Sequence, residues 1–131
     1  MSKIVYNKLV RTRIPNIIRQ NGSEPVIKQH KTRSEEAFKL LKEKILEEAK
    51  EVFNTKADDE LLEELADLQS VIDTLVLCRF GPRGKSMLDT VIDAKEITRG
   101  VFIEQEPGET QGSYNFFLNE LKEVNAKKEE E

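Results

Sequence analysis

Two consecutive helical patterns joined by a short connection constrain the fold of this chain more than any other feature. Apolar side chains recur at helical spacing from Thr32 to about Phe53, and again from about Asp59 to Phe80. The connection, of sequence NTKAD, is too short for any arrangement other than an antiparallel pair. The two apolar stripes consist of Phe38, Leu41, Ile45, Ala49 and Val52, and of Leu61, Leu65, Leu68, Ile72 and Leu75. The sequence therefore predicts a helical hairpin in which the stripes face one another.

Before the hairpin, the sequence predicts one short helix followed by extended chain. Pro15 suits the first turn of the helix PNIIRQ, and Asn21 with Gly22 is expected to end it. The segment EPVIKQHK then reads as extended. Thr32 and Glu35 form a capping-box pattern, which is expected to begin the first long helix.

After the hairpin, the sequence predicts two more helices. A Gly-Pro pair follows Phe80 and ends the second long helix. Ser86 with Asp89 is expected to begin a third long helix that ends at Gly100. The segment SYNFFLNELKEV, residues 113–124, is interpreted as a last amphipathic helix.

The composition supports a helix-rich chain. Of the 131 residues, 37% are hydrophobic and 35% are charged, with only 6 glycines and 4 prolines. We expect an all-α protein whose hairpin core completes a four-helix bundle through oligomerisation, with a short extended N-terminal segment. Residues 1–125 are predicted to form a single domain and residues 126–131 a charged flexible tail.

Charge, hydropathy and cysteine content argue against several classes of protein. The net charge of −4 argues against a general nucleic-acid-binding face, and no apolar run approaches the length of a membrane span. Cys78 is the only cysteine and has apolar neighbours, which predicts a buried, unreactive thiol and a cytoplasmic location. His30 is expected to be exposed and to bind no metal, because it lacks histidine or cysteine partners.

Two acidic pairs are the chief candidates for chemistry. Glu48 and Glu51 lie three residues apart in the first long helix, and Glu64 and Asp67 do so in the second, so each pair shares one helix face. Single acidic pairs are usually solvated. However, both pairs lie on the same-handed edge of their apolar stripes, and both are equally far from the turn. Antiparallel pairing is therefore expected to bring the four carboxylates together at one level.

Four neighbouring carboxylates need a compensating cation, because each partly desolvated charge disfavours ionisation of the others. Hard oxygen ligands suit Mg²⁺ or Mn²⁺, and the lack of a Cys/His cluster argues against zinc. Mg²⁺ commonly completes its coordination with water and with phosphate oxygens of a substrate. The pattern therefore indicates a nucleotide substrate.

Four blocks of the sequence resemble one protein family in the same order. The pattern E-x-x-E, twelve residues, E-x-x-D is similar to the metal-binding signature of the all-α NTP pyrophosphohydrolases, the MazG-like superfamily that includes phosphoribosyl-ATP pyrophosphohydrolase and all-α dUTPases. YNKLVRTRIPNIIRQNG resembles the N-terminal block of one branch, with Thr12 in place of the usual acidic residue. KEKILEEAKE with LLEELADLQSVID resembles the helical core, and AKEITRGVF resembles a C-terminal element, so the likeness covers Tyr6 to Phe102.

This resemblance implies a function and a set of metal ligands. The implied reaction is Mg²⁺-dependent hydrolysis of an NTP, a dNTP or a related nucleotide to the monophosphate and pyrophosphate, for the removal of unwanted nucleotides. The implied catalytic metal ligands are Glu48, Glu51, Glu64 and Asp67. The family also implies a homodimer or homotetramer, and no partner that is a nucleic-acid polymer or a membrane is expected.

Cations near such a site are candidates for binding phosphate. Lys8, Arg11 and Arg13 lie in the stretch KLVRTRIP, and the alternative for them is ordinary surface ion pairs. The aliphatic residues expected to anchor this stretch to the core are Leu9, Val10 and Ile14.

Three more basic residues and one glutamate carry open alternatives. Lys44 either contacts phosphate or pairs with Glu48. Lys95 and Arg99 either bind the phosphate or base, or act as favourable charges near a helix C-terminus. Glu47 is either a general base, a second-metal ligand or a residue on a solvated face.

Two other functions remain open at the level of sequence. The first is a dedicated phosphoribosyl-ATP pyrophosphohydrolase. The second is a non-catalytic helical module that acts by oligomeric binding or regulatory contact.

Overall fold

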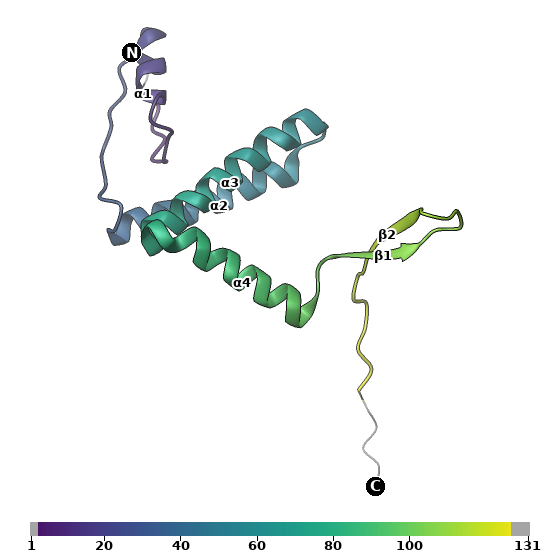
Figure 1. Ribbon diagram of the computed structural model, residues 1–131. Helices are drawn as coiled ribbons and strands as arrows, with labels where there is room; N and C mark the ends of the chain where they lie inside the picture. The colour runs from purple at the N-terminus through teal and green to yellow at the C-terminus, as the bar shows by residue number, and fades with distance from the viewer. Residues whose placement is uncertain (1–2, 127–131) are drawn as a thin grey trace. The chain divides into compact units, whose positions relative to one another are not determined.

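The computed structural model describes residues 3–126, and most of its regular structure is helical (Figure 1). Contacts within the chain divide it into two units, one ending at Asp89 and the other beginning at Thr90. We describe each unit by itself. The single domain over residues 1–125 stays a prediction, and residues 127–131 of the predicted tail lie outside the described residues.

The first unit begins with an extended segment that leads into helix α1, Ile14–Gln20. Pro15 occupies the first turn of this helix, as predicted, because a proline there lacks only an N–H that has no helical partner. Asn21 follows as the C-cap residue, and Gly22 adopts a φ of 90°, which suits glycine. The predicted short helix is therefore confirmed.

Helices α2, Glu35–Asn54, and α3, Asp58–Phe80, lie side by side as the predicted antiparallel hairpin (Figure 1). The predicted start of α2 needs correction, because Ser34 is its N-cap residue and not Thr32. The Ser34 hydroxyl accepts a hydrogen bond of 3.1 Å from the backbone N–H of Ala37. It also donates one to the carbonyl of Lys31, which fixes the entry of the chain into the helix.

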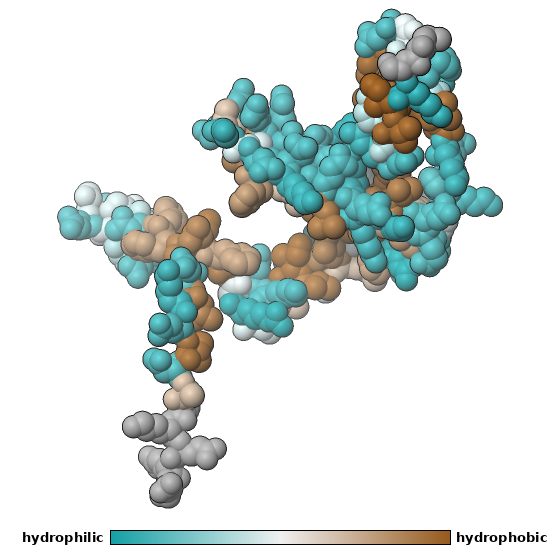
Figure 2. Space-filling model, turned by 180° about the vertical axis from the view of Figure 1, so that it is seen from behind, coloured by the Kyte–Doolittle hydropathy of each residue, from teal (hydrophilic) through white to brown (hydrophobic). Residues whose placement is uncertain are grey.

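The buried core of the described residues is small and lies near the start of α2. Ala37, Phe38 and Leu41 are its buried apolar residues, and the Arg79 guanidinium of α3 lies 4.7 Å from the centroid of the Phe38 ring. Many other hydrophobic side chains are exposed, among them Leu65 at 43%, and Figure 2 shows such side chains on the visible face. The hairpin thus leaves part of its apolar surface uncovered.

Helix α4, Gly84–Arg99, follows α3 after a single 3₁₀ turn, η1, at Gly81–Arg83. Gly81 has a φ of 74°, which lets the chain leave α3 as the sequence predicts. Helix α4 begins at Gly84, before the predicted cap at Ser86, and Gly84 is buried close to the backbone of Val76. A Cβ at Gly84 would lie 2.7 Å from the Val76 carbonyl oxygen, so only glycine allows this approach.

The predicted helix over residues 113–124 is wrong. The second unit contains an antiparallel pair of strands, β1 at Ile103–Pro107 and β2 at Tyr114–Leu118, with Ile103 opposite Leu118. Tyr114, Phe116 and Phe117 are aromatic residues, which favour strands, and Gly112 at a φ of 82° helps to form the turn. The fold is therefore mainly helical and not all-α.

Two smaller expectations are also corrected. Cys78 is half-buried rather than buried. His30 has a side chain only 16% exposed, and its Nδ1 lies 3.1 Å from the Glu36 carboxylate. Within residues 3–126, no helix combines the length and apolar character that crossing a membrane requires.

Candidate metal centre

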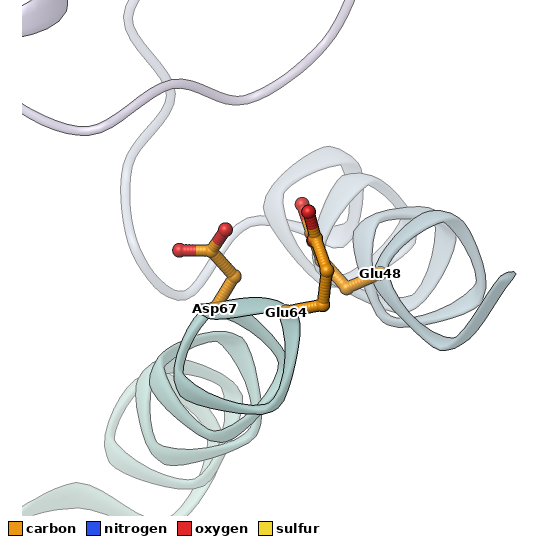
Figure 3. A group of neighbouring side chains, drawn as sticks. All are labelled: Glu48, Glu64 and Asp67. Atoms are coloured by element: carbon orange, nitrogen blue, oxygen red, sulfur yellow. The ribbon is translucent and has the colours of Figure 1, made fainter. Parts of the chain in front are cut away.

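Three carboxylates from the two hairpin helices come together in the first unit (Figure 3). Glu48 comes from α2, and Glu64 and Asp67 come from α3. One oxygen from each side chain lies within 4.8 Å of the others. Glu48 is buried, whereas Glu64 and Asp67 are half-buried, so the cluster is open to solvent on one side.

The turn between the helices explains which carboxylates meet. The connection is Thr55–Ala57, and Glu48 and Glu64 are each eight residues from its middle residue, Lys56. They therefore lie at the same height on neighbouring antiparallel helices. Asp67 is one turn further along the same face of α3 as Glu64.

The fourth predicted ligand, Glu51, lies outside this group. It is five residues from Lys56, so it lies nearer to the turn than Glu48 does. The predicted common level for all four carboxylates took the turn to be centred later in the chain than it is. Glu51 nevertheless lies close enough for its charge to act on Glu64.

The pKa of the Glu64 carboxyl is raised above its ordinary value of 4.5. Desolvation is the largest cause. The negative charges of Glu48, Glu51 and Asp67 raise this pKa further, and so does a side-chain hydrogen bond with Glu48. Two carboxyl groups form a hydrogen bond only when one holds a proton. The raised pKa thus makes Glu64 easier to protonate than an ordinary glutamate.

Lys44 supplies positive charge to the buried end of the cluster. Its Nζ lies 3.4 Å from a carboxylate oxygen of Glu48 and 3.3 Å from one of Glu47. The Lys44 side chain is only 17% exposed, so these pairs are partly shielded from solvent. Of the two alternatives for Lys44, the structure thus shows the pair with Glu48.

Glu47 connects α2 to the N-terminal segment rather than to the three carboxylates. Its carboxylate oxygen accepts from Lys44 and lies 3.7 Å from Nζ of Lys8. Nζ of Lys8 also lies 5.6 Å from the centroid of the Tyr6 ring, and Asn7 between them adopts a φ of 49°. A small pocket of about 60 Å³ lies beside this contact, and its lining includes Asn7, Lys8 and Lys44.

Arg11 brings a second cation of the N-terminal segment to the cluster itself. Its Nη2 donates a hydrogen bond of 2.7 Å to Oδ1 of Asp67. Both side chains are substantially exposed, at 61% and 42%. The sequence marked Arg11 as a candidate cation, but it gave no sign of this partner because the two residues are far apart in the chain.

Arg13 has no contact with this group among the described residues, and the roles of Lys95 and Arg99 stay predictions. Arg13 is the exposed N-cap residue of α1, and no ion pair of it is found among residues 3–126. Lys95 and Arg99 are exposed residues of α4 in the second unit. Of the aliphatic residues expected to anchor the segment, Leu9 and Ile14 are half-buried, but Val10 is 46% exposed.

The donor set fits a small hard cation. Carboxylate oxygens are ligands that Mg²⁺ and Mn²⁺ favour, and two ligands on opposite sides of Mg²⁺ are about 4.2 Å apart. Here one oxygen from each of the three carboxylates lies within 4.8 Å of the others, an arrangement in which three residues could hold one ion. Comparisons with protein-family models, with curated proteins and with solved structures give no match to this chain.

Proposed function

We propose that this protein is a Mg²⁺-dependent nucleotide pyrophosphohydrolase, which cleaves an NTP, a dNTP or a related nucleotide to the monophosphate and pyrophosphate. The single observation that carries the proposal is the meeting of Glu48, Glu64 and Asp67 from two antiparallel helices, with Arg11 beside them. The four-block resemblance to the MazG-like superfamily supports the same reaction. Mn²⁺ is an alternative metal.

In this proposal, the carboxylates bind the metal ion and the neighbouring cations bind the phosphate groups. Glu48, Glu64 and Asp67 would hold the ion, and the negative charge of Glu51 would add to the attraction for it. A bound Mg²⁺ supplies Lewis-acid polarisation of a phosphate and lowers the pKa of water. The guanidinium of Arg11 and the ammonium of Lys8 offer positive charge to the phosphate groups of the substrate.

Pyrophosphate release from a panel of nucleotides tests this proposal. The wild-type chain is expected to release pyrophosphate from at least one NTP or dNTP when Mg²⁺ is present, and to stop when the metal is chelated. The variants Glu48→Gln and Asp67→Asn should lose this activity. Glu63→Gln is the matched control, because Glu63 is an exposed neighbour of Glu64 on α3 and lies outside the cluster.

The outcome of this panel also separates the alternatives. Activity on phosphoribosyl-ATP without activity on ordinary nucleotides would identify the dedicated enzyme. A folded protein that releases no pyrophosphate from any member of the panel would refute the proposed reaction and favour a non-catalytic module. Substitutions of Lys95 and Arg99 in the same assay test the proposal that these residues contact the nucleotide.

A further inference from the structure

Arg11 and Asp67 form a contact between the cation-rich segment and the candidate metal centre. The guanidinium of Arg11 meets Asp67 at 2.7 Å, and Asp67 is one of the three clustered carboxylates. The same guanidinium is a candidate to bind a nucleotide phosphate at the metal. Its hydrogen bond to Asp67 uses an Nη2 donor, so a divalent ion that takes over Asp67 makes that donor available to phosphate.

From this geometry we infer that Arg11 is an exchangeable counter-ion of the centre, released from Asp67 when a divalent ion binds and then available to phosphate. This inference rests on the proposed function. A divalent ion on Asp67 weakens the attraction of that carboxylate for Arg11 and repels the guanidinium directly. Release is inexpensive, because ion pairs as exposed as this one contribute little to stability.

Other contacts of the same segment do not involve the three clustered carboxylates. Lys8 lies 3.7 Å from Glu47, which is outside the group of three carboxylates. Leu9, the next residue, is half-buried. A divalent ion on the cluster therefore competes with Arg11 but not with Lys8.

Binding of Mn²⁺ to the metal-free protein, followed by electron paramagnetic resonance without nucleotide, tests the competition. Arg11→Gln is expected to bind Mn²⁺ about two- to fivefold more tightly than wild type, the range that an exposed ion pair gives. Arg13→Gln is the matched control, since it removes the same charge from the same segment, and it should bind Mn²⁺ as wild type does. In saturating Mg²⁺, Arg11→Gln should bind pyrophosphate more weakly than wild type does. The substitution is thus expected to strengthen metal binding but to weaken phosphate binding.

The nuclear magnetic resonance signals of the Arg11 guanidinium N–H groups, among them the Nη2 donor, report the release itself. In Asp67→Ala without metal, these signals give the reference position of a released guanidinium, because alanine removes the acceptor. Adding Mg²⁺ to wild type should move the signals toward that reference. Signals that stay in place while Mg²⁺ binds, or equal Mn²⁺ affinity of Arg11→Gln and wild type, would overturn the inference and leave the proposed function standing. Failure of every form to bind Mn²⁺ would overturn both.

Discussion

Glu64 lies in surroundings that disfavour a negative charge on its carboxyl group. Desolvation raises its pKa, as do the charges of Glu48, Glu51 and Asp67. The folded chain therefore binds a proton at Glu64 more tightly than the unfolded chain does. The stability that this proton contributes is fully present below the unfolded pKa, and it is lost as the pH rises through the raised folded pKa.

We predict that Glu64→Gln makes the metal-free protein less sensitive to pH. Glutamine keeps a hydrogen-bond donor for Glu48 and removes one repelling charge. In chelator, the melting temperature of wild type should fall relative to that of Glu64→Gln as the pH rises above the ordinary glutamate value of 4.5. Glu63→Gln should follow the wild-type profile. Identical profiles for wild type and Glu64→Gln would contradict the raised pKa.

The carboxylates are predicted to differ in importance. Glu48→Gln and Asp67→Asn remove members of the group of three and should lower pyrophosphate release by about 10² or more, as loss of a group that stabilises developing charge does. Glu51→Gln should lower it less, because Glu51 lies outside that group. Steady-state assays at several Mg²⁺ concentrations measure both effects. Equal losses for Glu51 and Asp67 would show that Glu51 is a full ligand.

At the scale of elements, local sequence patterns predict which segments form helices and in what order. They do not predict the residue at which each helix begins or ends. Thr32 and Ser34 both precede α2 and are both residue types that cap helices. Ser34 is the N-cap residue, because its hydroxyl accepts a hydrogen bond from the N–H of Ala37 and donates one to the carbonyl of Lys31. The error at residues 113–124 has another cause, since helical and alternating periods are hard to distinguish over a short aromatic run.

The choice of cap gives a prediction for stability. Ser34→Ala should lower the free energy of unfolding by about 1 kcal/mol, which is typical of a lost N-cap hydrogen bond. Thr32→Ala should leave it nearly unchanged, because the structure places Thr32 before the cap. Urea unfolding followed by circular dichroism measures both changes. A larger loss from Thr32→Ala than from Ser34→Ala would restore the predicted capping box.

At the scale of the whole molecule, many large apolar side chains of the described residues are exposed to solvent in the single chain. Leu62 of α3 is 70% exposed, and Phe116 of β2 is 63% exposed. Large exposed apolar areas commonly mark contact surfaces, and an isolated two-stranded sheet is marginal in water. These observations favour the expected homo-oligomer, in which a second hairpin would complete a four-helix core.

We therefore predict a dimer or tetramer in solution. Sedimentation equilibrium at micromolar concentration should give two or four times the mass of the chain. Leu62→Lys should shift this distribution toward smaller species if α3 forms the contact, whereas Lys39→Gln, an exposed charge on α2, should not. A monomer across the accessible concentration range would contradict the prediction.

The sequence alone determined the helical hairpin and two paired carboxylate positions, because helical period and i, i+3 spacing are local properties. Only the tertiary structure decided which carboxylates meet, since their heights depend on the true centre of the turn at Lys56. It also decided that Arg11 faces Asp67 and that Lys44 and Lys8 share Glu47. Such contacts join residues from separate elements, and no local pattern encodes which partner a long, flexible cation will choose.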